Sequence, residues 1–476
     1  MSSIFTKSSS GKNKVKLPDY HLDESLNIPA DYLRDDLDLV DVNETEIVRH
    51  YTNLSLMNFG VDNGLYPLGS CTMKYNPKIN EKLASLSFFN NLHPLFKPES
   101  KDLQTVLGII FELGNFLSAI TGMAKFSLAP AAGSHGELAG AMIIKKYFAN
   151  KNDKRDTILI PDSAHGTNPA SVAICGFKVK EIPSDSMGNV DLEQLRQNLD
   201  QNVAAMMLTA PNTLGLFDHN ILEIAQLLHK NGSLFYGDGA NLNAIIGQVK
   251  MRDLGFDLIH LNLHKTFATP HGGGGPGSGP IGVSEDLVNY LPLPSVVKKD
   301  NLFYFDYDSP DSIGRIHSFY GNFLVFLKAY FYLLLIGEEG IKKISENAVL
   351  NANYLMSKLK NDYNLPYDRL CLHEFVINDQ NFPNKITTNE IAKRLLDYGF
   401  HAPTIYFPLL VPGAMMIEPT ETESKDSLDN FLEVLLKIKS EASQSPELLK
   451  EAPIKTPVKK VNVVLAARKP ILKWPR

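Results

Sequence analysis

The segment DLIHLNLHKTF, residues 257–267, combines a lysine with a strictly alternating pattern of residue types. The alternation sets three apolar residues against three polar ones: Ile259, Leu261 and Leu263 against His260, Asn262 and His264. A period of two predicts a strand that stops at Lys265, before a loop rich in glycine and proline. A lysine amine held at the rim of a desolvated cavity is a nucleophile towards aldehydes, so Lys265 is the candidate for Schiff-base chemistry. The alternative is a surface lysine that ends a strand.

Two polar residues at the ends of other apolar runs have the types that a pyridoxal phosphate (PLP) ring needs. We expect Asp238, in GDGAN, to pair with the pyridine nitrogen and keep it protonated, which makes the ring an electron acceptor. We expect His165, in DSAHGTNP, to stack on the ring. Each has a structural alternative, because aspartate is common in turns and helix caps and a histidine at a turn is often only hydrogen bonded there.

The segment AAGSHGE, which contains Gly133 and Ser134, follows an apolar run and opens a predicted helix from Glu137 to Phe148. The backbone N–H groups at a helix start attract anions, so this segment is a candidate for holding a phosphate. The alternative is ordinary N-capping of the helix by Ser134.

The elements that position these residues are predicted from the alternation of short apolar runs with helical stretches between Phe126 and Val283. This pattern is typical of βαβ units and of a mostly parallel sheet. The turns that carry the candidate residues would then share one edge of that sheet, where open α/β sheets bind ligands. Apolar residues at helical spacing also predict a helix over residues 101–120, and a long helix is expected to start near Asn322.

The predicted domains are an N-terminal arm at 1–95, a large α/β domain at 96–321 and a small C-terminal α+β domain at 322–476. The small domain ends in a tail from Lys455 that contains seven basic residues, no acidic residue and the only tryptophan, Trp474. Such a tail is expected to be solvated or to dock on a partner.

Two motifs are expected to be decoys. Residues 272–277 satisfy the GxGxxG spacing, but they follow no strand and open no helix, so a dinucleotide site is not predicted. His260 and His264 lie four residues apart on a predicted strand, where that spacing does not bring two imidazoles together, so no metal site is predicted.

Composition narrows the class of protein further. The 476 residues have a formal net charge of -6, which gives no overall attraction to nucleic acid. The three cysteines are far apart and form no CxxC pair, which favours a reducing compartment. We found no apolar leader and no spanning stretch, so the sequence predicts a cytoplasmic protein without a membrane partner.

Several segments, in the same order along the chain, resemble the P-protein family of glycine dehydrogenase (decarboxylating). They are HLNLHKTFATPHGGGGPGSGPIGV, YPLGSCTMKYNP, AAGSHGELAG, DSAHGTNPAS, YGDGANLNAI and AARKPILKW. The length and the lysine resemble the separate C-terminal, second subunit of that family. Ser278 departs from the larger residue usual there, which leaves the local shape of its loop open.

The resemblance implies a PLP-dependent transferase of fold type I, with PLP as cofactor. By position, Lys265 is the Schiff-base lysine, Asp238 the partner of the ring nitrogen and His165 the stacking residue. The further assignments by position are Ser134 and Asn262 near the phosphate, where the helix start also offers Gly133, and Thr209 near the ring hydroxyl. Arg315, His317 and Asn322 are guesses for the group that binds the substrate carboxylate.

The implied reaction is decarboxylation of glycine, with transfer of the aminomethyl group to the lipoyl disulfide of an H-protein. The implied assembly pairs the chain with a first P-protein subunit, and the pairs form a heterotetramer. One rival is a PLP decarboxylase that releases a free amine, which would work without a lipoyl protein. Another rival is a non-catalytic scaffold subunit, which would show no absorbance band dependent on Lys265.

Overall fold

The computed structural model describes residues 3–9, 11–12, 28–33, 39–92, 100–272 and 277–472. Contacts divide the chain into two units, residues 64–454 and residues 1–63 together with 455–476. Part of the glycine-rich segment, residues 273–276, and Trp474 lie outside the described residues.

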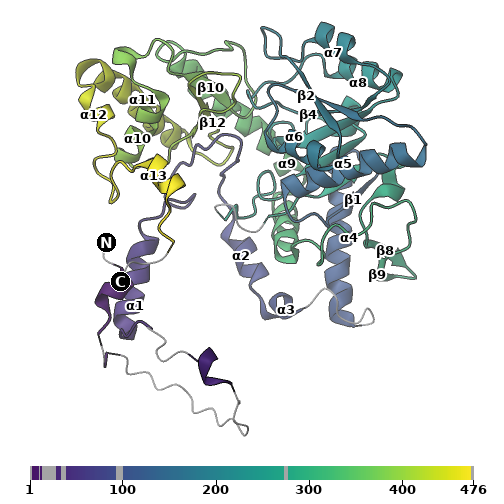
Figure 1. Ribbon diagram of the computed structural model, residues 1–476, viewed down its shortest axis with the longest axis horizontal. Helices are drawn as coiled ribbons and strands as arrows, with labels where there is room; N and C mark the ends of the chain where they lie inside the picture. The colour runs from purple at the N-terminus through teal and green to yellow at the C-terminus, as the bar shows by residue number, and fades with distance from the viewer. Residues whose placement is uncertain are drawn as a thin grey trace. The chain divides into compact units, whose positions relative to one another are not determined.

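The larger unit alternates helices and strands (Figure 1). Its first half contains α2 (Lys78–Ala84), α3 (Ser87–Asn90), α4 (Lys101–Thr121), β1 (Lys125–Ser127), α5 (Gly133–Asn150), β2 (Thr157–Pro161), α6 (Thr167–Ile174), β3 (Lys178–Ile182), α7 (Leu192–Asn198), β4 (Val203–Thr209), α8 (Ile221–Lys230), β5 (Leu234–Gly239), η3 (Leu242–Ala244), η4 (Met251–Leu254) and β6 (Leu258–Leu261). Its second half contains β7 (Ile281–Val283), η5 (Glu285–Tyr290), β8 (Ser295–Lys299), β9 (Leu302–Asp306), α9 (Phe323–Leu359), β10 (Phe375–Asn378), η6 (Pro383–Lys385), α10 (Thr388–Asp397), β11 (Thr404–Ile405), β12 (Ala414–Ile417), α11 (Lys425–Gln444) and α12 (Glu447–Lys450).

A seven-stranded sheet in the order β1-β7-β6-β5-β4-β2-β3 forms the centre of this unit. The neighbours from β6 to β3 pair in parallel, and β7 runs antiparallel to both of its neighbours, β1 and β6. The mostly parallel sheet predicted from the sequence is therefore confirmed. Parallel strands place their carboxyl ends at one edge, and the turns after β2, β4, β5 and β6 meet there.

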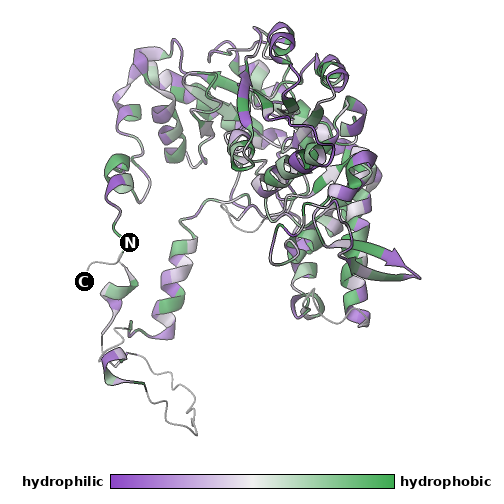
Figure 2. Ribbon diagram, turned by 45° about the vertical axis from the view of Figure 1, so that its right-hand side comes forward, coloured by the Kyte–Doolittle hydropathy of each residue, from purple (hydrophilic) through white to green (hydrophobic). Residues whose placement is uncertain are grey.

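Helices cover both faces of the sheet. One face packs against α4, α7, α8 and the start of α9 through strand residues such as Leu159, Phe235 and Ile259. The other packs against α5 and α6 through residues such as Ile158 and Tyr236. Burial on both faces explains why the central strand β4 is apolar at nearly every position and buried at all of them. Figure 2 shows hydrophobic strands between helices of mixed colour.

The predicted helix over 101–120 is confirmed as α4. Ser100 caps its first turn by accepting from the N–H of Leu103, and Gly122 ends it with a left-handed φ of 76°. By length and composition alone, α4 is the one helix among the described residues that is apolar enough to cross a membrane. Its apolar face packs in the large core, with Leu107, Leu113 and Leu117 fully buried, as in a core helix of a globular domain.

A second core lies around the three-stranded antiparallel sheet β10-β12-β11. The long helix α9 starts at Phe323, as expected, and serves both cores, with Phe326 in the first and Leu355 in the second. Gly337, with φ 61° and ψ -173°, interrupts α9 between those two halves. The helices α10 and α11 bury Leu395 and Phe431 against the small sheet. The division of this unit into domains at residues 321 and 322 stays a prediction.

Residues 64–92, which the sequence grouped with the N-terminal arm, belong to the larger unit. Leu65 is 2% exposed in the second core, and Leu68 forms a bridge with Ile417 of β12. Contacts to residues far away in the sequence, such as the bridge from Leu68 to Ile417, hold this segment, and such contacts leave no local pattern.

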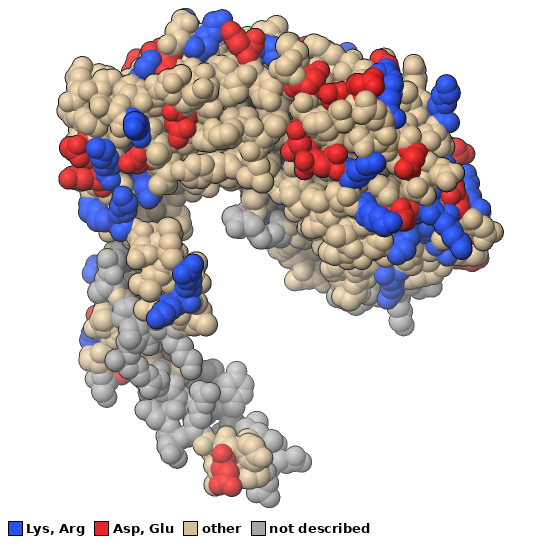
Figure 3. All heavy atoms as spheres, turned by 45° about the horizontal axis from the view of Figure 1, so that its top comes forward, with Lys and Arg blue, Asp and Glu red and all other residues tan. Residues whose placement is uncertain are grey.

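The smaller unit contains η1 (Ile4–Lys7), η2 (Ala30–Tyr32), α1 (Glu44–Ser55) and α13 (Val463–Arg468). Asn43 and Glu46 form a capping box at the start of α1. In the described part of the basic tail, Lys455 to Leu472, every residue is exposed except Thr456, which is half-buried. In Figure 3, acidic and basic side chains are interspersed over the face of the larger unit that is drawn.

Candidate active site

Lys265 lies in a turn beyond the end of β6. The predicted strand is shorter than the alternation suggests, because β6 ends at Leu261. Its neighbour β7 pairs only as far as His260, and the N–H of Lys265 then closes a turn on the carbonyl of Asn262 at 3.1 Å. The turn leaves the lysine half-buried beside the cavity at the carboxyl edge of the sheet.

Asp238 stands in a row of polar residues across three parallel strands. The register pairs Thr209 of β4 with Asp238 of β5, and Asp238 with His260 of β6. One carboxylate oxygen of Asp238 accepts from the Asn168 amide at 3.2 Å and lies 3.5 Å from the Thr209 hydroxyl. The other accepts from the N–H of Ala240 at 2.9 Å. The carboxylate is therefore held in place on a residue that is 3% exposed.

The groups around Asp238 keep it ionised. Burial alone would raise the pKa of Asp238, but His260, the N–H of Ala240, Lys265 and Asn168 together hold that pKa below its usual range. Burial also lowers the pKa of His260, so its imidazole is neutral. His260 places Nε2 3.3 Å from the Asp238 carboxylate, while its Nδ1 lies 2.7 Å from the hydroxyl of Tyr236. The sequence analysis considered His260 only as a metal ligand and missed this supporting position.

His165 lies at the cavity wall, where its Nδ1 is 2.8 Å from the hydroxyl of Thr167. Burial, followed by the charge of Lys265, lowers the pKa of His165, although its outer edge is exposed. The Thr167 hydroxyl also bonds Glu137 of α5 at 2.9 Å, and Glu137 itself lines the cavity. Glu137 is a site residue that sequence reasoning missed, since its only signal was its place in the AAGSHGE turn.

The start of α5 comes unusually close to the end of β6. A Cβ on Gly133 would lie 2.4 Å from the Asn262 amide nitrogen, so a side chain there would collide with Asn262. The helix begins at Gly133, earlier than predicted, and its N-cap is Ala132, so Ser134 is not the capping residue. The N–H groups of this first turn have no acceptor within the helix and border the cavity beside Ser134 and Asn262.

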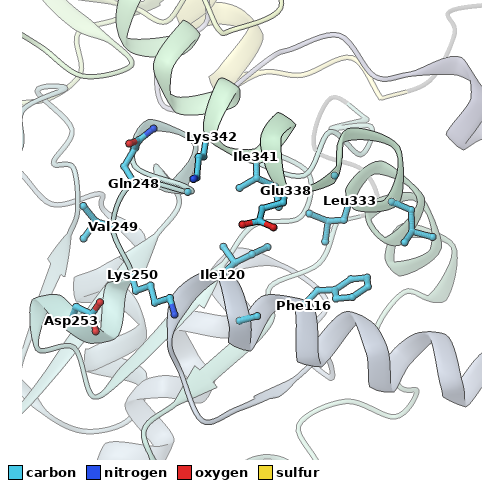
Figure 4. Close-up of a pocket in the computed structure, with 14 residues that line it drawn as sticks. Phe116, Ile120, Gln248, Val249, Lys250, Asp253, Leu333, Glu338, Ile341 and Lys342 are labelled. Atoms are coloured by element: carbon cyan, nitrogen blue, oxygen red, sulfur yellow. The ribbon is translucent and has the colours of Figure 1, made fainter.

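All the residues predicted to bind PLP meet in one cavity of about 390 Å³. Its lining includes Gly133, Ser134, His165, Thr209, Asp238, Asn262 and Lys265, and also Ser70, Cys71, Thr213, Thr404 and Phe407. Figure 4 shows a larger cavity of about 730 Å³ between α4, α9 and residues 247–253. That cavity is lined by apolar side chains such as Phe116, Ile120 and Ile341 and contains none of the residues predicted to do chemistry.

One wall of the site is the segment Gly69–Thr72, which is clamped by two buried glutamate side chains. Glu374 accepts from the N–H of Ser70 at 2.7 Å, and Glu418 accepts from the N–H of Thr72 at 3.0 Å. Both glutamates are fully buried. Ser70 and Thr72 have φ values of 66° and 46°, in the left-handed region that side chains disfavour. The clamp therefore holds a strained wall in place and presents Cys71 to the cavity.

Lys74 continues this clamp next to the reactive turn. Its amine, on a residue that is 2% exposed, donates to the Thr266 carbonyl and to Glu421, both at 2.5 Å. Burial alone would lower the pKa of Lys74, but Glu421 and Tyr332 outweigh it and raise that pKa, so the amine is charged. The paired Lys74 amine therefore holds the carbonyl of Thr266, the residue that follows Lys265.

The three guesses for the substrate carboxylate are not brought to this cavity. Arg315 is exposed with its guanidinium over the Tyr307 ring, and His317 bonds the carbonyl of Phe319 at 2.8 Å. Asn322 is the N-cap of α9. Among the described residues, none of the three lines the cavity that contains Lys265.

The residues present fit a PLP molecule. Four buried side-chain oxygens in or beside the cavity have no partner within the described structure, on Glu137, Asn168, Asn241 and Asn262. Buried polar groups of this kind are normally satisfied by a ligand or water. The cavity also offers an amine for an aldehyde, a carboxylate for a ring nitrogen and helix N–H groups for a phosphate. Its volume lies within the range of small-molecule sites.

Two family models match the chain. The model of the glycine dehydrogenase C-terminal domain matches residues 344–456, and the class-V aminotransferase model matches residues 134–274. The second match runs from Ser134 in α5 to beyond the reactive turn and contains all the residues predicted to bind PLP except Gly133.

Curated relatives match over almost the whole chain. A probable glycine dehydrogenase (decarboxylating) subunit 2 of Caldanaerobacter subterraneus subsp. tengcongensis is 56% identical over 477 residues, which are 99% of this chain and 98% of the relative. The protein of the same description from Thermotoga maritima is 51% identical over 475 residues, 99% of each chain.

Solved structures share the fold at low identity. An inhibitor-bound glycine decarboxylase (P-protein) of the glycine cleavage system has a TM-score of 0.73 and 18% identity, covering 87% of this chain and 93% of that chain. A cysteine desulfurase from Thermococcus onnurineus has a TM-score of 0.63 and 14% identity, covering 80% and 95%.

These comparisons confirm the family resemblance, the fold type I architecture, the enzyme class and the cofactor that the sequence predicted. The chain belongs to the glycine dehydrogenase (decarboxylating) subunit 2 family and is a PLP-dependent enzyme subunit of fold type I.

Proposed function

We propose that this chain, in complex with a first P-protein subunit, decarboxylates glycine and transfers the remaining aminomethyl group to the lipoyl disulfide of an H-protein. The observation that carries the proposal is the presence of Lys265 and Asp238 in one cavity at the carboxyl edge of the sheet. Family membership supports glycine as the substrate, since the relatives are described as glycine dehydrogenase (decarboxylating).

When bound, PLP supplies an aldehyde for amines and an aromatic ring that accepts electrons. Lys265 would hold the aldehyde through its amine until the amine of glycine displaces it. Asp238 would hold a proton on the ring nitrogen, because its carboxylate stays ionised in a buried site. Its fixed orientation lets it stabilise the developing charge without reorganising.

Other residues would orient the group. The first turn of α5, with Ser134 and Asn262, is suited to the phosphate because its N–H groups border the cavity. Thr209 is suited to the ring hydroxyl, since it stands beside Asp238 in the strand register. His165 would cover one face of the PLP ring. Phe407 packs edge-on against the imidazole of His165, with ring centroids 5.5 Å apart.

The transfer step balances without a nicotinamide. The C–C bond to the carboxylate breaks and releases CO2, a C–S bond forms to one lipoyl sulfur, and the S–S bond breaks. The second sulfur is reduced to a thiolate, which takes up a proton. The disulfide on the partner protein is therefore the oxidant. A slender lipoyl arm would pass the glycine-rich segment 272–279, part of which lies outside the described residues.

The partners and location remain proposals. The description of the relatives as subunit 2 supports a separate first subunit, and we propose that the pairs assemble into a heterotetramer. The cytoplasm also stays a prediction. All three cysteines are free, which suits a reducing compartment.

The deciding experiment is coexpression with the first subunit, followed by exchange of labelled CO2 into glycine with lipoylated H-protein. We expect exchange that requires the H-protein and is absent from a Lys265→Ala complex. Release of free methylamine without H-protein would instead favour an ordinary decarboxylase. An absence of exchange in a complex that binds PLP through Lys265 would overturn the substrate.

A further inference from the structure

Three residues form a continuous hydrogen-bonded chain from the cavity wall to its buried floor. His165 Nδ1 lies 2.8 Å from the Thr167 hydroxyl, and that hydroxyl lies 2.9 Å from Glu137 Oε1. Glu137 is 5% exposed and lies close to the carboxylate of Asp238 and the imidazole of His260. The proposed function assigns no role to Glu137.

The positions of the hydrogens along this chain are constrained by one backbone contact. The Thr167 N–H, which is only a donor, approaches the same Nδ1 at 3.3 Å. Nδ1 therefore acts as an acceptor, and the proton of the neutral imidazole lies on Nε2. The Thr167 hydroxyl must then donate to Nδ1 as well. Because a hydroxyl has a single proton, the remaining contact with Glu137 requires a proton on the glutamate.

An ionised Glu137 would reverse the chain. The Thr167 hydroxyl would donate to the carboxylate, and its oxygen would have to accept from His165. The imidazole proton would then move to Nδ1, where the Thr167 N–H would lose its acceptor. The state of one carboxyl group thus decides which nitrogen of His165 carries the hydrogen.

The surroundings favour the protonated carboxyl. Burial, followed by the charge of Asp238, raises the pKa of Glu137 to about 8, although Thr167 and Lys265 act in the opposite direction. Glu137 Oε2 is buried without a partner among the described residues. The other titratable groups that line the same cavity are Cys71, His165, Asp238, His260, His264, Lys265 and His271.

We propose that Glu137 is a positioning residue whose carboxyl proton, relayed by the Thr167 hydroxyl, keeps His165 in the form with hydrogen on Nε2. Nδ1 is occupied by Thr167, so Nε2 is the ring nitrogen available to a ligand. With its hydrogen, Nε2 donates to an anionic oxygen of the ligand, such as a carboxylate. Without it, Nε2 would be an acceptor and would repel that oxygen.

The test follows the imidazole nitrogens of His165 by 15N NMR in the full-length chain labelled in histidine, with His165→Asn to assign its signals. In the wild type without PLP, we expect the hydrogen on Nε2 at pH 7 and on Nδ1 well above pH 8. In Glu137→Gln and in Thr167→Val this pH-dependent exchange should vanish. Thr167→Ser, which retains the hydroxyl, should restore it.

The matched control is Glu223→Gln, a substitution of an exposed glutamate on α8 that pairs with Arg196 at the surface. It should leave the tautomer exchange unchanged. Persistence of the exchange in Glu137→Gln, or hydrogen on Nδ1 at pH 7 in the wild type, would overturn the proposal.

The catalytic consequence rests on the proposed function and is measured separately. The ratio kcat/KM of CO2 exchange should fall above about pH 8 in the wild-type complex, and this alkaline limb should be absent in Glu137→Gln. If the complex shows no exchange at all, the proposed function fails while the NMR result still decides the role of Glu137. If exchange occurs and the limb remains in Glu137→Gln, only the Glu137 proposal fails.

Discussion

The carboxylate of Asp238 lies 3.3 Å from Nε2 of His260, because the two residues stand directly opposite each other in the register of β5 and β6. The Tyr236 hydroxyl bonds the other imidazole nitrogen at 2.7 Å. Burial raises the pKa of Tyr236 well above its usual value, so the phenol keeps its proton and donates it to Nδ1. His260 therefore presents its Nε2–H side to Asp238 as a neutral group.

Asp238→Asn is expected to reduce kcat of CO2 exchange by about 10²–10³-fold, because an amide does not hold a proton on the ring nitrogen. The amide has the shape of the carboxylate, so PLP should still bind and absorb. The matched control is Asp153→Asn, which changes the exposed ion-pair partner of Arg155 and should leave kcat unchanged. Full activity of Asp238→Asn would remove the ring-nitrogen role.

Lys265→Ala is expected to abolish covalent attachment of PLP. After reconstitution and borohydride reduction, mass spectrometry should find the cofactor fixed to the wild-type chain and absent from the variant, with loss of the corresponding absorbance band. Lys178→Ala, whose side chain is 76% exposed in the wild type, serves as the control. Retained attachment in Lys265→Ala would place the reactive amine elsewhere.

Lys74→Met is expected to lower the free energy of unfolding by about 3–5 kcal/mol, because it leaves Glu421 as a buried charge without its cation. Urea unfolding monitored by circular dichroism measures the change. The double variant Lys74→Met/Glu421→Leu should recover most of the loss. Lys425→Ala, at an exposed ion pair with Asp429, should leave the free energy of unfolding almost unchanged, because solvent screens that pair. Equal losses for both lysines would contradict the buried clamp.

Glu418→Gln is expected to remove part of the pH dependence of stability. Burial raises the pKa of Glu418 from 4.5 to about 7 in the folded chain, so the folded state holds this proton more tightly than the unfolded chain does. Its stabilising contribution is complete below pH 4.5 and is lost as the pH rises to about 7.

The variant should therefore match the wild type near pH 4.5 and exceed its stability at pH 8 by up to about 3 kcal/mol. Urea midpoints across this range provide the measurement. Glu447→Gln, on an exposed side chain, should keep the wild-type slope. A parallel slope in Glu418→Gln would show that Glu418 does not carry the extra proton.

Local patterns in the sequence were sufficient for the main elements of the large sheet and for the main catalytic candidates. The period of two around His260 identified β6, helical spacing identified α4, and the alternation of both predicted a parallel sheet. Once the strands are parallel, the turns that carry His165, Asp238 and Lys265 must share an edge. Their convergence therefore followed from the sequence pattern, and the structure confirms that these residues line one cavity.

The end of β6 was predicted less well, because alternation continues to His264 while the partner strand β7 stops pairing at His260. Glu137 and His260 were missed as site residues for a related reason. Their roles depend on register and on the close approach of α5 to the sheet, where a Cβ on Gly136 would lie 2.9 Å from the His260 Cβ. Neither the strand register nor this distance between helix and sheet is encoded within a short segment.

The sequence by itself determined the strands, the helices and the chemistry available at each turn, because periodicity and residue type are local properties. Only the tertiary structure brought Glu374, Glu418 and Lys74 around the reactive turn, since these contacts join residues about 190 to 350 positions apart. Burial in that shared environment then decided which carboxyl groups keep a proton, because the cost of a buried charge depends on all its neighbours at once.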